Sequence, residues 1–108
     1  MLLEVRETGQ PRGFRLIGEL DISNAETLAA VLDREVEEQG DISLDLSDLT
    51  FIDSSGIRVL LRAMDRLSGR GKIILASPTS SVRHVLSLMG LDDHDSIRVV
   101  GPGERGGP

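Results

Sequence analysis

Residues 41–46 constrain the fold more than any other part of this 108-residue sequence. Ile42, Leu44 and Leu46 alternate there with polar residues, and a two-residue period is typical of a β-strand with one buried face. The segment follows a predicted helix, and a strand reached through a helical crossover runs parallel to the strand before it. Parallel strands that are covered on both faces lose such alternation. We therefore expect a sheet with helices mostly on one face and with at least part of the other face exposed to solvent.

The remaining sequence alternates between strand-like and helix-like segments. Strands are expected at about residues 3–7, 14–18, 41–46, 72–76 and 97–100. Helices are expected from about residue 24 to Gly40, from about residue 54 to Ser68, and from about residue 80 to Gly90. Residues 47–53 are expected to turn from the third strand into the second helix. The predicted fold class is α/β, one domain over residues 1–100 with a mixed, mostly parallel sheet of about five strands and about three helices mainly on one face.

Residues suited to helix capping precede the first and third predicted helices. Ser23 and Glu26 have the spacing of a capping box, in which the two side chains bond reciprocally to backbone N–H groups. For the third helix, either Ser80 or Ser81 is a candidate cap.

The stretch Asp53-Ser54-Ser55-Gly56 opens the second predicted helix. A helix start has unpaired backbone N–H groups and the positive end of the helix dipole, so it suits a negative group such as phosphate. A serine there can cap the helix, and Asp53 can act as a second cap or as a turn former. Because Gly56 has no side chain, a partner could approach the serine backbone closely. The local sequence leaves two interpretations of the serines open, a cap with its neighbour or a modification site.

Two motifs, in this order, resemble the STAS domain family, and among its members the bacterial anti-sigma factor antagonists. Asp53-Ser54-Ser55-Gly56, preceded by Leu49-Thr50-Phe51-Ile52, is similar to the family's phosphorylation loop, and Gly18-Glu19-Leu20-Asp21 is similar to its first motif. The resemblance covers about residues 3–100 and implies a STAS-type fold. It also implies that a kinase phosphorylates the second serine of the loop, which is Ser55 here. The sequence alone does not choose Ser55 over Ser54, and that choice comes from the family.

The resemblance implies a function and a set of partners. The unphosphorylated protein would bind an anti-sigma factor kinase and free a sigma factor, phosphorylation of Ser55 would end the binding, and a phosphatase would restore it. ATP and Mg²⁺ would belong to the kinase, so the protein is expected to have no cofactor. The implied contact surface is one rim of the sheet with Asp21, Asp53, Ser54, Ser55, Gly56 and Arg58. Asp21 has an alternative interpretation as a simple turn residue at a strand end. A second possible role for a STAS domain is that of a subunit in a sensory or transport-linked assembly.

Arg58, Arg62 and Arg66 recur at every fourth position along the outer side of the second predicted helix. A solvated helix face is the ordinary explanation of such a stripe. A surface that meets an acidic patch of a partner is the alternative.

Composition excludes several other functions. The sequence lacks cysteine, which excludes disulfides and thiolate metal sites and fits a reducing cytoplasm. Its formal net charge of −6 argues against direct nucleic-acid binding. It has no apolar run of about 20 residues, so no membrane span is expected. Residues 101–108 are rich in glycine and proline and are expected to form a disordered tail, where the family usually carries a final helix.

A serine-dependent enzyme is a remote alternative from a different functional class. It would need a base, normally histidine, within hydrogen-bond reach of Ser54 or Ser55. His84 and His94 fall in or after the third predicted helix with nothing to orient them, and the loop is not a Gly-x-Ser-x-Gly elbow. Neither histidine has ligand-spaced neighbours, so no metal site is expected. The protein is predicted not to be an enzyme.

Overall fold

The computed structural model describes residues 2–10 and 12–101 and contains a five-stranded sheet whose strand order follows the chain. The strands are β1 (Leu3–Glu7), β2 (Gly13–Leu20), β3 (Ile42–Ile52), β4 (Ile73–Ala76) and β5 (Ile97–Val100). The helices are α1 (Ala25–Glu35), α2 (Ser54–Leu67), α3 (Ser80–Leu88) and the short 3₁₀ helix η1 (Leu91–Asp93). Strands β1 and β2 pair antiparallel, and the other three pairs are parallel. The mixed, mostly parallel α/β fold predicted from the sequence is confirmed.

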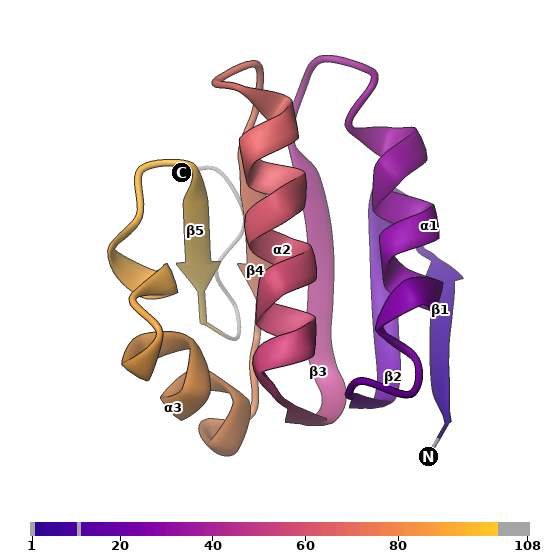
Figure 1. Ribbon diagram of the computed structural model, residues 1–108, viewed down its shortest axis with the longest axis vertical. Coiled ribbons are helices and arrows are strands. Elements are labelled where there is room, and N and C mark those ends of the chain that lie inside the picture. Colours follow the sequence, from indigo (N-terminus) through magenta and orange to yellow (C-terminus); the bar gives the residue numbers. More distant parts are fainter. Residues whose placement is uncertain (1, 11, 102–108) are drawn as a thin grey trace.

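The three α-helices lie together on one face of the sheet (Figure 1). Because helical crossovers between neighbouring parallel strands are right-handed, successive helices fall on the same side of a sheet whose strand order follows the chain. The core between the layers is aliphatic: Leu28 and Leu32 of α1 and Leu60 of α2 are almost completely buried against the strands. Burying such a side chain contributes roughly 1.5–3 kcal/mol, so this one layer carries most of the fold's apolar stabilisation.

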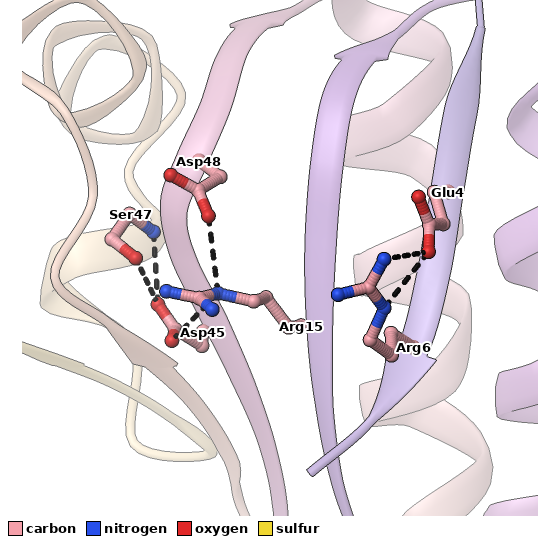
Figure 2. Close-up of polar contacts among 6 residues, drawn as sticks. All are labelled: Glu4, Arg6, Arg15, Asp45, Ser47 and Asp48. Carbon is pink, nitrogen blue, oxygen red and sulfur yellow. Dashed lines mark hydrogen bonds and ion pairs between the residues drawn. The ribbon is translucent and has the colours of Figure 1, made fainter.

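Part of the opposite face of the sheet is polar, as the alternation in β3 predicts. Figure 2 shows Glu4, Arg6, Arg15, Asp45, Ser47 and Asp48 on this face, with the helices behind the strands. Arg15 Nε lies 3.2 Å from Asp48 Oδ2 and 3.4 Å from Asp45 Oδ2, which links β2 to β3. These side chains are partly exposed, so each ion pair is worth at most about 1 kcal/mol. The pairs cover a sheet face on which the described residues place no helix.

Strand β3 extends past Leu46 to Ile52, and the prediction of a turn over residues 47–53 is wrong for most of that range. Two irregularities in the pairing with β2 explain the error. The partners of Arg15 and Ile17 are Asp45 and Asp48, and those of Gly18 and Glu19 are Leu49 and Phe51. Each irregularity inserts one extra residue in β3 and breaks the two-residue period. Leu46, Leu49 and Ile52 are therefore all buried although they are three residues apart.

Two predicted helix caps are also wrong. Ser23 does not cap α1, because its hydroxyl donates to Asp21 Oδ1 at 2.5 Å and the helix begins only after Asn24. Helix α3 begins after Thr79, whose hydroxyl accepts a hydrogen bond from Val82 N, so Ser80 and Ser81 lie within the first turn. Serine, threonine and aspartate all cap well, and the backbone path decides which of several neighbouring candidates does so.

The described residues end at Gly101, just after β5. The expectation of a disordered tail over residues 101–108 therefore falls almost entirely outside the described residues. Within the described residues, none of the helices combines the length and the apolar character that crossing a bilayer requires.

Candidate functional site

Strands β2 and β3 end at the same edge of the sheet. Leu20 pairs with Ile52, and Asp53 N donates to Leu20 O at 3.2 Å. Because the two strands are parallel, the residues that follow them, Asp21 and Asp53, leave the sheet side by side. The geometric expectation that both aspartates lie on one rim is confirmed. In Figure 1 both α1 and α2 begin at this rim.

Asp53, and neither serine, caps α2. Its Oδ1 accepts hydrogen bonds from Ser55 N at 2.8 Å and Gly56 N at 3.4 Å. The carboxylate thus satisfies two of the N–H groups that a helix start leaves unpaired. Within the described residues, the hydroxyls of Ser54 and Ser55 make no hydrogen bond. The interpretation of the serine pair as a cap is therefore wrong, and both hydroxyls are available for other chemistry.

The two serines differ in their surroundings. Ser54 is exposed to solvent, whereas Ser55 is half-buried and lines a groove between α1 and α2. Gly56, the next residue, is buried against the ends of β2 and β3. A Cβ at this position would lie 2.7 Å from side-chain atoms of Leu20 and 2.9 Å from Ile52 Cγ1. Gly56 thus lets the first turn of α2 lie directly on the strand ends, a packing role that the sequence analysis missed.

The groove beside Ser55 has a volume of about 230 Å³ and runs between the first turns of α1 and α2. The groove is lined by side chains of the two helices, which recur at helical spacing, and of the turn before α1. These are Ile22, Ala25, Glu26 and Ala29 on one side, and Ser55, Arg58, Val59 and Arg62 on the other. Two of the alanines of α1, Ala25 and Ala29, leave the space open, because a larger side chain at either position would fill it. The side chain of Ile22 stands at the mouth of the groove with 82% of its surface exposed.

The three arginines predicted to form a stripe on α2 have different partners. Arg66 Nη1 donates to Asp33 Oδ1 of α1 at 2.7 Å, and Arg62 Nη2 lies 3.7 Å from Asp33 Oδ2. Arg58 is exposed and makes no ion pair with any described residue. All three arginines are exposed, so the predicted solvated stripe is confirmed. Arg66 also bridges to α1 through Asp33, and Arg58 is the arginine left free beside Ser55.

Asp21 forms a tight turn after β2. Its Oδ1 accepts from Ser23 N at 2.9 Å and from the Ser23 hydroxyl, and the hydrogen bond from that hydroxyl lowers the pKa of Asp21. Asn24 supports the same turn, since its Oδ1 accepts from Asp21 N at 3.0 Å and its Nδ2 donates to Glu19 O at 2.8 Å. This network presents Ile22, which the sequence analysis missed as a candidate site residue. The only available signal was an isoleucine between turn-forming polar residues.

Neither histidine lies at the groove. His84, on α3, lines a separate hollow together with Phe51 and Val85, and His94 Nδ1 accepts a hydrogen bond from Ser96 N at 3.2 Å. Among the described residues, no group of three histidine or acidic side chains could hold a metal ion. The groove therefore contains a serine hydroxyl without a histidine base, next to one free guanidinium.

Known proteins share both the sequence pattern and the fold. The sequence profile of the STAS domain matches residues 3–99. A protein from Thermotoga maritima, provisionally assigned as an anti-sigma factor antagonist, has a TM-score of 0.70 at 26% identity, over 94% of this chain and 87% of that one. The anti-sigma factor antagonist SpoIIAA of Bacillus, in its unphosphorylated form, has a TM-score of 0.62 at 25% identity, over 81% of this chain and 83% of that one. An anti-sigma factor antagonist from Mycobacterium paratuberculosis shares the fold with a TM-score of 0.75 at 20% identity, over 90% and 84% of the two chains. Because the profile match covers nearly the whole chain, this protein belongs to the STAS domain family.

Proposed function

We propose that the protein is an anti-sigma factor antagonist controlled by phosphorylation of Ser55. The unphosphorylated form binds an anti-sigma factor kinase at the rim formed by Asp21, Asp53 and the start of α2, and the bound kinase releases its sigma factor. The observation that carries this proposal is the Ser55 hydroxyl, which has no hydrogen bond within the described residues and lines a groove at the helix start. The relative SpoIIAA supports it, because that protein is known in an unphosphorylated and in a phosphorylated form.

The chemistry of the switch belongs to the kinase and a phosphatase. Ser55 Oγ attacks the γ-phosphorus of Mg-ATP, the bond to the β,γ-bridging oxygen breaks, ADP leaves, and the hydroxyl proton passes to a base on the kinase. A phosphatase reverses the change when water attacks the phosphoserine and inorganic phosphate leaves. The protein itself contributes the hydroxyl and its position. Since Asp53 already caps α2, the hydroxyl can be modified without the loss of a cap.

Phosphorylation ends the binding by changing the charge of the contact surface. A phosphoserine carries about −1.5 to −2 charges at neutral pH, and the start of a helix accommodates them. The same charge next to Asp53 and Asp21 repels acidic groups of a partner and costs desolvation when the surface is covered. The fold is expected to stay intact, so the switch works by blocking the contact and not by unfolding.

Matched serine variants test the phosphorylation site. The wild type, S54A and S55A are incubated with the kinase and Mg-ATP, and the modified residue is located by mass spectrometry. We expect one phosphate on the wild type and on S54A, and none on S55A. A phosphate on Ser54 or Thr50 would contradict the assignment. Co-purification of the protein with a transporter or sensory subunit, and with no kinase, would favour the alternative role in such an assembly.

The protein is further expected to have no hydrolytic or transferase activity of its own. The histidines of the described residues lie away from Ser55, so no such base activates the hydroxyl. Turnover of a generic ester or nucleotide that survives repurification and disappears in S55A would overturn this expectation.

A further inference from the structure

The free guanidinium of Arg58 is the starting point for an inference about the phosphorylated state. Of the three arginines spaced along this side of α2, Arg62 and Arg66 both face Asp33 across the helix pair. Arg58 has no ion-pair partner among the described residues, although Glu26 lines the opposite wall of the same groove. One cation is therefore available at the end of the groove where Ser55 lies.

The spacing of Ser55 and Arg58 brings their side chains to the same wall. Residues three positions apart on an α-helix are neighbours on its surface, with Cβ atoms about 5–6 Å apart. Both side chains line the groove between α1 and α2, so they also share a direction. A phosphate on Ser55 Oγ extends toward the groove and comes within reach of the long Arg58 side chain.

The cap of α2 occupies two of the backbone donors that a phosphate would use at a helix start. Asp53 Oδ1 already accepts hydrogen bonds from Ser55 N and Gly56 N. These two N–H groups are not available to a phosphate at this position, whereas the planar guanidinium can donate two parallel hydrogen bonds to it. Glu26 lines the other wall, and the second arginine of the groove, Arg62, lies 3.7 Å from Asp33.

We infer that Arg58 pairs with the phosphate of phosphorylated Ser55 inside the groove between α1 and α2. This inference builds on the proposed function and adds a receptor for the modification within the protein itself. The pairing holds the phosphate in a fixed position beside the exposed Ile22, so phosphorylation converts an open groove with a free cation into one whose cation is paired and whose net charge is negative.

The test uses protein with phosphoserine encoded at position 55, so that it needs no kinase. The second ionisation of the phosphate, with a pKa near 6 in a free phosphoserine, is followed by phosphorus NMR. We expect R58Q to raise this pKa by about half a pH unit, because a neighbouring cation favours the dianion and solvent screens the effect. The matched control R66Q removes the same charge from the same helix and is expected to change the pKa little, because Arg66 is bound to Asp33.

Two results would overturn the inference: a pKa that R58Q leaves unchanged, or equal changes in R58Q and R66Q, which would reflect overall charge and not a contact. Circular dichroism melts show whether each variant is folded, and the exposure of Arg58 predicts that R58Q is. The titration is independent of any kinase. If the titration shows no effect of R58Q, the pairing is wrong but the proposed switch at Ser55 is not affected. If a kinase modifies another residue, the proposed function is wrong, but the titration still tests the pairing.

Discussion

The two ends of the α1–α2 helix pair are built differently. At the end where both helices stop, which we call the closed end, Arg70 Nη2 donates to Val36 O at 3.0 Å and Arg66 bonds to Asp33, and both contacts join the two helices. Arg12, just before β2, ties the chain after α1 to the sheet, because its Nη1 donates to Gln39 O at 2.6 Å. The groove with Ser55 and the free Arg58 lies at the other end, where both helices start, which we call the open end. The closed end satisfies carbonyl groups that a helix leaves unpaired at its C-terminus. Whether an arginine of this helix layer joins parts of the fold or is free to bind a partner therefore depends on its surroundings and not on its residue type.

The largest effect that the comparison predicts is on binding at the open end. Phosphorylation of Ser55 is expected to weaken kinase binding by about 100-fold or more, because a desolvated anion enters the contact surface. The melting temperature should change by less than about 2 °C, since the modified hydroxyl supports no bond within the described residues. The substitution S55D carries less charge and should weaken binding less. Titration calorimetry and melts of the same samples measure both quantities, and a melting temperature that collapses along with affinity would contradict the blockade.

The second prediction concerns the tight packing of Gly56 against Leu20 and Ile52 at the open end. We expect G56A to lower the free energy of unfolding by about 1–2 kcal/mol, since overpacking costs about 1–3 kcal/mol and alanine's higher helix propensity recovers up to about 1. The added Cβ would meet side-chain atoms of Leu20 at 2.7 Å. The control is G9A, because a Cβ at Gly9 has no atom within 4 Å. Urea unfolding compares the two, and equal stabilities would show that Leu20 and Ile52 yield easily.

The third prediction separates capping from signalling at the helix start. D53A is expected to lower the free energy of unfolding by about 0.5–2 kcal/mol, as the loss of an N-cap does. S55A should change it by less than about 0.5 kcal/mol, because the Ser55 hydroxyl is not the cap. Thermal or urea unfolding of both variants is the measurement. A stability loss in S55A as large as that in D53A would mean that the serine shares the capping role.

Sequence patterns predict the layers of this fold but not its local bonds. The alternation of Ile42, Leu44 and Leu46 is enough to predict a sheet with one polar face, and parallel strand ends place Asp21 next to Asp53. The end of β3 was missed because extra residues in one strand turn a period of two into a period of three, which resembles no regular strand. The candidate serine loop was found through its resemblance to a family, since local sequence does not distinguish a cap from a modification site.

Contacts between helices were beyond sequence analysis for a different reason. Asp33 and Arg66 come from separate helices, and nothing in the spacing of either helix indicates that they meet. Without that contact the three arginines of α2 look equivalent. The special position of Arg58 therefore emerges only when the partners of the other two are known.

A smaller predicted effect, on stability, compares Arg66 with Arg58 directly. R66Q breaks a partly exposed hydrogen-bonded ion pair, with side-chain exposures of 40% for Arg66 and 41% for Asp33. Such pairs contribute about 0.2–1 kcal/mol, so we expect a loss of about 0.5 kcal/mol for R66Q and a change near zero for R58Q. A double-mutant cycle of R66Q with D33N, measured in low salt and in 1 M salt, isolates the pair, because salt screens exposed charges.

The order of the two variants should reverse when kinase binding is measured, with the larger effect in R58Q. R58Q removes a cation that no described residue neutralises, so it is expected to weaken binding of the unphosphorylated protein to the kinase by about tenfold, the equivalent of about 1.4 kcal/mol. R66Q should leave the affinity unchanged, since its guanidinium is directed at Asp33. Titration calorimetry at two salt concentrations gives both affinities and their salt dependence. If R66Q weakened binding as much as R58Q, the kinase would be responding to the overall charge of α2, and the distinction between an open and a closed end of the helix pair would lose its functional meaning.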